Sequence, residues 1–188
     1  MSRVRDSQRS KLYRAERTLE AAHAPMILRT KDEAYRFIDK ILSSAWARRQ
    51  WPQLERKRYN LGVLRWKRPD IVMRRMAATA GQHSGNEIKL NPDYATPLVI
   101  VHELAHWIEK WAARDYSKPS TPGHGREFAA IYLLLVRHVF GFEAHKQLRQ
   151  AYVANGVRYR AKRKISAEAM ERLRERGRQL QQQRQEVA

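Results

Sequence analysis

Residues 102–106 read His-Glu-Leu-Ala-His, a pattern that can hold a metal ion and use it. On an α-helix His102 and His106 lie one turn apart on the same face, so their imidazoles can converge on one ion. Glu103 lies about 100° around the helix from His102, where it can reach a water on that ion without being an obvious ligand. The pattern predicts a Zn²⁺ site in which Glu103 accepts the proton of an activated water.

A hydrolytic zinc site needs a third protein ligand and one open position. His124 is the strongest candidate, because it lies between two glycines in the sequence Thr-Pro-Gly-His-Gly-Arg-Glu-Phe at 121–128. The glycines allow a tight turn close to the site, and Phe128 begins an apolar helix face that would fix the loop. Glu127 remains an alternative, as the carboxylate of a His-His-Glu site.

Other kinds of metal site are excluded by the sequence. The chain contains no cysteine, so disulfides, thiolate nucleophiles and Cys-containing metal sites are all ruled out. The metzincin arrangement, in which a glycine and a third histidine follow closely, is ruled out because Glu109 and Ala112 occupy those positions. Histidine and carboxylate are therefore the ligands expected for a transition metal.

Taken together, the motifs at 102–106 and 124–128 resemble those of the SprT-like zinc metallopeptidases, over about residues 61–140. Residues 5–16 are also similar to a segment of small metallohydrolases from actinobacteria and their phages. The resemblance implies a zincin-like α+β fold and a zinc-dependent peptidase activity.

For the individual residues, the resemblance implies that His102, His106 and His124 bind zinc and that Glu103 is the general base. SprT-like enzymes such as the Spartan proteases cut proteins that are bound or crosslinked to DNA. This chain differs from many of them because it has no cysteine-rich zinc ribbon.

The motif must lie on a helix for this geometry to form. Thr96 and Pro97 are an N-cap and a first-turn proline, so they predict a helix from there to about residue 111 or 113. The third histidine precedes a predicted helix over 125–140, which Gly141 ends. A further helix is predicted over 143–154.

Two more helices are predicted near the N-terminus, and one at the other end of the chain. Apolar residues recur at helical spacing over residues 6–23. Thr30 and Glu33 have the spacing of a capping box, so the second helix starts there and ends before Pro52. Residues 166–188 are predicted to form a separate basic helical extension of a catalytic domain spanning residues 1–165.

The middle of the chain predicts a small antiparallel sheet of about three strands. Residues 61–66 and 71–76 are rich in β-formers and flank a Lys-Arg-Pro-Asp turn, and residues 87–90 alternate in polarity. Because strand 87–90 precedes the motif helix, we expect it to line the cleft and to offer an unpaired edge to an extended protein or peptide substrate. The predicted fold class is therefore α+β.

The charge of the chain is a second functional signal. Its 38 Lys and Arg against 19 Asp and Glu give a formal net charge of +19. Such a charge favours contact with nucleic acid through a basic surface, so we expect substrates among nucleic-acid-associated proteins. The alternative is a basic nucleic-acid-binding or phage accessory protein whose zinc is structural, with Glu127 as a fourth ligand.

Two further expectations concern location and catalysis. The first residues contain no apolar signal segment, and the longest apolar run, 128–136, is too short to span a membrane, so we expect a cytoplasmic protein without membrane contact. The residues that could stabilise an oxyanion are Tyr94, Tyr116, Arg126 and Tyr152. The hydrogen-bond partners of the three histidines cannot be assigned from the sequence.

Overall fold

A computed structural model describes residues 6–20, 26–56, 65–66, 68–77, 79–113 and 123–159. The helices in these ranges are α1 (Arg9–Glu20), α2 (Lys31–Leu42), α3 (Ala45–Gln50), α4 (Pro97–Ile108) and α5 (Arg126–Ala154). The strands are β1 (Glu55–Arg56), β2 (Arg65–Trp66), β3 (Asp70–Met73), β4 (Gly81–Ser84) and β5 (Glu87–Leu90). The predicted α+β class is confirmed, and the predicted helix within 166–188 lies outside the described residues.

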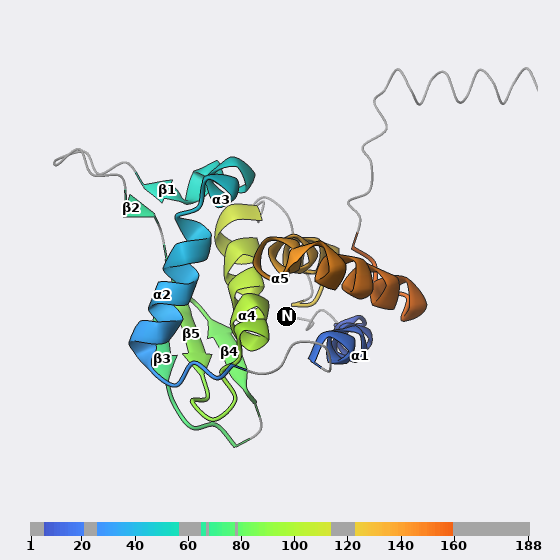
Figure 1. Ribbon diagram of the computed structural model, residues 1–188, viewed down its shortest axis with the longest axis horizontal. Coiled ribbons are helices and arrows are strands. Elements are labelled where there is room, and N and C mark those ends of the chain that lie inside the picture. Colours follow the sequence, from blue (N-terminus) through green and yellow to red (C-terminus); the bar gives the residue numbers. More distant parts are fainter. Residues whose placement is uncertain are drawn as a thin grey trace, which may run out of the picture.

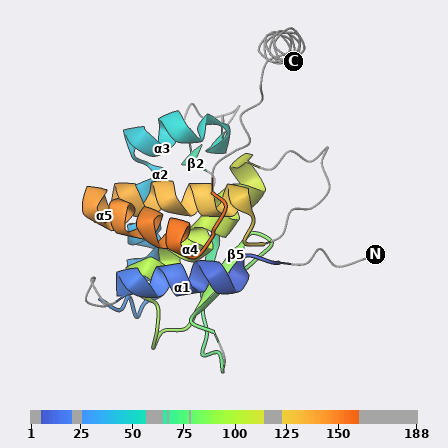
Figure 2. The same cartoon turned by 90° about the vertical axis from the view of Figure 1, so that its right-hand side faces the viewer.

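Helix α4 lies at the centre of the molecule and separates two layers. Figure 1 shows α2 and the sheet of β3, β5 and β4 on one side of α4, and α1 with α5 on the other. Turned by 90°, the molecule shows α1 running alongside α5 (Figure 2). Most residues of α4 are buried on both sides, which explains the nearly continuous apolar sequence around the motif.

The three-stranded sheet has the order β3-β5-β4 and differs from the prediction. It is mixed, because β5 pairs parallel with β3 and antiparallel with β4. Gly85, with a φ of 63°, turns β4 back into β5, and this hairpin places β5 between β4 and β3. Strand β4 was not predicted, because the sequence Gly-Gln-His-Ser has neither β-branched residues nor an apolar alternation.

The predicted strand 61–66 does not belong to this sheet. Its described part is β2, which pairs antiparallel with β1 in a separate two-stranded sheet. Residues 61–64 lie outside the described residues. The predicted strand 71–76 is β3, which begins one residue earlier and ends at Met73.

The predicted helix starts are confirmed where a side chain caps the backbone. The Thr30 hydroxyl accepts a hydrogen bond from the Glu33 backbone N–H at 3.2 Å, and the Glu33 carboxylate accepts one from the Thr30 N–H at 2.9 Å. The helix ends at Leu42 and not just before Pro52, because Ser44 caps a new helix, α3, through a 3.1 Å bond from the Ala47 N–H. Helix α4 starts at the predicted Thr96 cap and continues as a π-helix over Glu109–Ala113.

The two helices predicted over 125–140 and 143–154 form one element with a sharp break. Gly141 has a φ of 91° inside α5, a backbone conformation that residues with a side chain rarely adopt. By length and mean hydropathy α5 is the one candidate membrane span among the described residues. It is broken at Gly141 and packs against α1 and α4, as a core helix does.

Candidate metal and catalytic site

The motif residues lie on the buried face of α4, close to β4. His102 and Glu103 are 6% and 7% exposed, and His106 is partly buried. Trp107, the neighbour of His106, is fully buried and donates a hydrogen bond from its indole N–H to Asn86 in the β4–β5 turn at 3.2 Å. The motif helix is thereby held against the sheet, so the direction of its histidines is fixed.

The structure brings the third predicted histidine to the first two. His124 lies in the turn before α5, whose cap is Gly125, and it is buried. Each of His102, His106 and His124 offers one ring nitrogen, and these three nitrogen atoms lie within 4.8 Å of one another. These three residues could hold a metal ion. The alternative ligand Glu127 is exposed and does not belong to this group.

Two carboxylates from the N-terminal region fix two of these imidazoles. Glu16 of α1 lies 2.6 Å from Nδ1 of His102, and Asp6 lies 2.6 Å from Nδ1 of His124. Because ionised carboxylates only accept hydrogen bonds, both Nδ1 atoms carry the hydrogen and both Nε2 atoms present a lone pair. Glu16 and Asp6 are the partners that the sequence could not assign.

The arrangement of the Nε2 atoms fits a bound cation. Nε2 of His102 and Nε2 of His124 lie 3.3 Å apart, so two lone pairs face each other unless a proton or a metal ion lies between them. The imidazole of His106 is in the same group, and its ring centroid lies 4.8 Å from that of His124. Three converging nitrogen donors suit a metal ion better than a shared proton.

The charges around the histidines differ between the three residues. Burial opposes the charged form of His102, but the charge and hydrogen bond of Glu16 outweigh burial and raise its pKa. Burial and its neighbours His102 and His124 hold the pKa of His106 well below its usual value. Burial likewise lowers the pKa of His124, although the hydrogen bond that its imidazole donates to Asp6 acts in the opposite direction. Neutral imidazoles at His106 and His124 are the form that binds metal.

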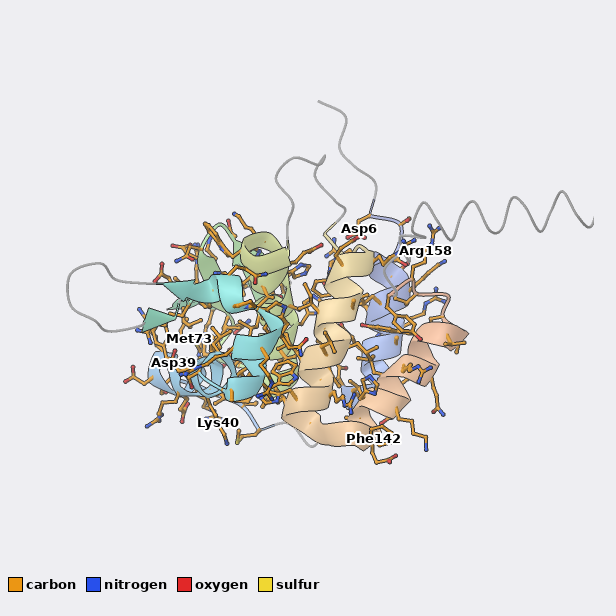
Figure 3. All side chains as sticks on the ribbon, turned by 90° about the horizontal axis from the view of Figure 1, so that it is seen from above. Asp6, Asp39, Lys40, Met73, Phe142 and Arg158 are labelled. Atoms are coloured by element: carbon orange, nitrogen blue, oxygen red, sulfur yellow. The ribbon has the colours of Figure 1, made fainter. Side chains whose placement is uncertain are left out.

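Gln8 ties the loop of the third histidine to the rest of the protein. Its buried side-chain amide donates to the His124 carbonyl at 3.1 Å and to the Arg158 carbonyl at 3.3 Å. Its side-chain oxygen accepts from the Arg158 backbone N–H at 2.6 Å. Figure 3 shows Asp6 and Arg158 near each other at one end of the molecule, with Phe142 at the opposite end. The segment before α1 therefore holds both the backbone and the imidazole of His124.

Glu103 lies in a tight and poorly hydrated position against β4. A Cβ atom on Gly81 would lie 2.8 Å from Cγ of Glu103 and 2.9 Å from Cγ1 of Val99, so β4 can approach the carboxylate only with a glycine there. Burial raises the pKa of Glu103 to about 7, while His102 and a backbone hydrogen bond from His83 oppose this rise. A carboxyl group with a pKa near 7 can both accept and deliver a proton at neutral pH.

A cavity of about 320 Å³ opens beside His102 and Glu103, and four residues of α1 line it, among them Arg9 and Tyr13, which the sequence did not single out. The ring of Tyr13 stacks on that of His102, with centroids 5.5 Å apart and an interplanar angle of 7°. Its centroid lies 5.3 Å from that of His124. The Arg9 guanidinium lies 5.7 Å from the centre of the Tyr13 ring. Arg9 and Tyr13 are one helical turn apart, but nothing in the sequence shows which helix faces the motif.

The residues predicted to stabilise an oxyanion lie elsewhere. Tyr94 is 61% exposed and does not line this cavity. Tyr152 is fully buried outside it, and Arg126 lines a separate cavity of about 180 Å³ that His124 also lines. Tyr116 lies outside the described residues. The phenol and guanidinium that line the cavity with Glu103 are those of Tyr13 and Arg9.

The predicted unpaired edge of strand 87–90 is wrong. This strand is β5, and both of its edges are paired, one with β3 and one with β4. Within the described part of the chain β4 pairs with β5 alone, and Gly81 of β4 lines the cavity beside Glu103. The strand that offers an edge next to the site is therefore β4.

The site thus combines three convergent imidazoles, a buried carboxyl group with a raised pKa, and a phenol beside a guanidinium. This set of groups can bind a cation, move a proton and stabilise a developing negative charge. No protein-family model, curated protein or solved structure matches the chain in comparisons with known proteins.

Proposed function

We propose that this protein is a zinc-dependent peptidase of the HExxH class. The observation that carries the proposal is the convergence of His102, His106 and His124 beside a cavity that also contains Glu103. The likeness of the two sequence motifs to those of SprT-like metallopeptidases supports it. A peptidase also explains why the buried carboxyl group lines the same cavity as His102, one of the three histidines.

The donor set favours zinc among the common metals. Three imidazole ligands without thiolates, beside a cavity that leaves room for a further ligand, are typical of catalytic zinc sites. Zinc bound there would supply a Lewis acid that polarises a carbonyl group and makes a water molecule more acidic. Glu16 and Asp6 orient two of the three ligands and increase the basicity of their Nε2 atoms.

In this proposal Glu103 is the proton carrier. Its carboxylate takes a proton from the attacking water and later delivers it to the nitrogen of the leaving amine. Its pKa of about 7 in the metal-free protein suits this double role, and a nearby cation would shift the equilibrium toward the carboxylate. The close approach of Gly81 restricts the carboxyl group to this position.

Tyr13 and Arg9 are proposed to stabilise the oxyanion that forms when water attacks a peptide carbonyl. Both line the same cavity as Glu103, and the guanidinium over the phenol ring places a fixed positive charge there. Burial and Glu16 raise the pKa of Tyr13, so its hydroxyl stays protonated and can donate a hydrogen bond. Preorganised donors of this kind act where negative charge develops.

The backbone of an extended substrate is proposed to pair with β4. Strands with an exposed edge bind peptides through main-chain hydrogen bonds. The β4 edge runs from Gly81 beside Glu103 to Ser84, so a peptide paired with it would pass the proton carrier. This proposal replaces the expectation for β5.

The competing proposal is a structural zinc site in a nucleic-acid-binding protein, which requires a fourth protein ligand. Glu127, the residue expected in that role, is exposed and outside the histidine group, and within the described ranges no carboxylate joins that group. The site geometry therefore favours the enzyme. A preference for nucleic-acid-associated proteins rests on the net charge of +19, and the basic runs 57–58 and 160–164 lie outside the described residues.

The test combines metal analysis with hydrolysis of a denatured protein mixture by the full-length, zinc-loaded chain. We expect one zinc per chain and new peptide ends, with Glu103→Gln keeping zinc but losing hydrolysis by about 10²-fold to 10⁴-fold. His102→Ala should lose both zinc and hydrolysis, while Glu127→Gln serves as the matched control and should keep both. Equal zinc content in His102→Ala and wild type, or hydrolysis by Glu103→Gln at the wild-type rate, would refute the proposal.

A further inference from the structure

A second, larger cavity adjoins the cavity beside His102 and Glu103 and is lined mainly by apolar side chains. Its volume is about 480 Å³, which is within the usual range of ligand pockets. It lies at the start of α4, between the loop before that helix and Phe140 near the break in α5. The apolar residues that line it are Ile27, Tyr94, Pro97, Leu98, Val99 and Phe140.

The two cavities share a wall. Leu98 and Val99 line both, and Val99 lies one helical turn before His102 on α4. Ala80 also lines both, and it directly precedes Gly81 at the start of β4. A peptide that follows the β4 edge past Glu103 therefore reaches the apolar cavity without leaving the surface.

The charged groups of the apolar cavity restrict its ligand. Its two charged lining residues, Glu20 and Asp93, are both acidic. They disfavour anionic ligands such as fatty acids or phosphates and tolerate neutral or basic ones. Tyr94, 61% exposed, presents an aromatic ring that a neutral apolar group would cover.

We infer that the apolar cavity binds a bulky apolar side chain, such as that of Phe or Leu, of a peptide whose backbone lies at the metal site. The inference rests on the proposed function for the position of the backbone, and it names the class of substrate. The enzyme selects peptides with a large apolar residue beside the bond to be cut. Basic residues next to that position strengthen binding through Glu20 and Asp93.

Binding is tested in the full-length, zinc-loaded Glu103→Gln variant, in which bound peptides persist. Two blocked peptide series differ only by Phe or Ser at one scanned position, and their dissociation constants are measured by fluorescence polarisation. At one position we expect Phe to bind about tenfold or more tightly than Ser, because the apolar ring leaves water. Equal affinities at every position, or no binding of any peptide, would overturn the inference, as would tighter binding of dodecanoate than of the Phe peptide.

Two variants locate this preference in the cavity. Ala80→Leu fills the shared wall and Tyr94→Ser removes an exposed ring, so each should reduce the Phe-to-Ser ratio by about threefold or more. Ala154→Leu, at the exposed end of α5, is the matched control and should keep the ratio. An unchanged ratio in both test variants would contradict the inference.

The outcome is independent of hydrolysis. A Phe preference without hydrolysis by the wild type would refute the proposed reaction and leave the pocket in place. Hydrolysis without any Phe preference would refute the pocket and leave the proposed reaction in place.

Discussion

Helices α4 and α1 both contribute to the site, but they do so in different ways. On α4 the two histidines and Glu103 lie within five consecutive residues, and helical geometry alone brings them together. On and before α1, the residues Asp6, Tyr13 and Glu16 contact histidines that are 86 or more residues away in the sequence. A short motif can therefore predict candidate metal ligands, whereas the groups that orient these ligands lie far away in the sequence and cannot be predicted from it.

Helix α1 contributes a buried carboxylate to the candidate site in addition to its apolar packing face. Glu16 is buried at 6% exposure, and a carboxylate is costly at such a place unless it is paired. Its partner is His102 at 2.6 Å. If α1 served only to cover the core, an apolar residue would fill this position at lower cost.

The largest effect expected from α1 is that of its phenol. Tyr13→Phe keeps the ring that stacks on His102 but removes the hydroxyl, so kcat should fall by about 10²-fold with zinc content unchanged. Steady-state kinetics on a peptide cut by the wild type, together with metal analysis, measures both. The control Tyr152→Phe, at a buried tyrosine that does not line this cavity, should keep its rate. A normal kcat in Tyr13→Phe would contradict the proposed role of the Tyr13 hydroxyl in stabilising the oxyanion.

The next largest expected effect is on stability, because burial of the ionised Glu103 carboxylate lowers the free energy of unfolding of the metal-free protein. Its folded pKa of about 7 lies above its ordinary value of 4.5, so the metal-free folded protein holds an extra proton between these pH values. This loss of unfolding free energy is absent below pH 4.5, grows as the pH rises, and reaches about 3 kcal/mol above pH 7. We therefore expect metal-free Glu103→Gln to be more stable than the wild type at pH 8, and equally stable at pH 4.5.

Urea unfolding of the metal-free proteins at the two pH values measures this difference. Glu127→Gln, a change at an exposed position, should have no effect at either pH. A pH-independent difference, or a less stable Glu103→Gln protein at pH 8, would show that burial of the carboxyl group is not the dominant cost.

The smallest effect concerns metal affinity. Glu16→Gln keeps a hydrogen-bond acceptor but removes the charge, so the zinc dissociation constant should rise by about 10-fold to 100-fold. Asp6→Asn should do less, because the Asp6 side chain is 26% exposed against 8% for Glu16. Competition with a chelator of known affinity gives both constants. Glu20→Gln, one turn further along α1, is the control. An equal effect there would show that Glu16 acts through its negative charge alone and not through its hydrogen bond to His102.

Features that depend on residues close together in the sequence were predicted correctly, whereas features that depend on distant residues were not. The capping box of Thr30 and Glu33, the Thr96 cap and the break at Gly141 are present as predicted, because each depends on a few neighbouring residues. The sheet was predicted with the wrong pairing, because β5 joins β3 across the intervening β4 hairpin. Pairing partners far apart in sequence leave no mark in the local pattern.

The same distinction applies within the site. His102, His106 and Glu103 followed from helical spacing, and His124 from the glycines beside it. Tyr94, Tyr152 and Arg126 were reasonable by residue type but do not line the cavity beside His102 and Glu103. Residue type shows which chemistry a side chain can do, and its position in the fold shows whether it can reach the reaction.

By itself the sequence determined which residues can bind a metal ion and that cysteine takes no part, since ligand chemistry and helical periodicity are properties of a few residues. Only the tertiary structure decided that α1 supplies Glu16 and Tyr13, that Asp6 precedes it, and that β4, not β5, is an edge strand of the three-stranded sheet among the described residues. The physical reason is that packing of the apolar faces of α1, α4 and α5 selects these neighbours. Apolar packing determines which residues become neighbours, but these residues share no recognisable sequence motif.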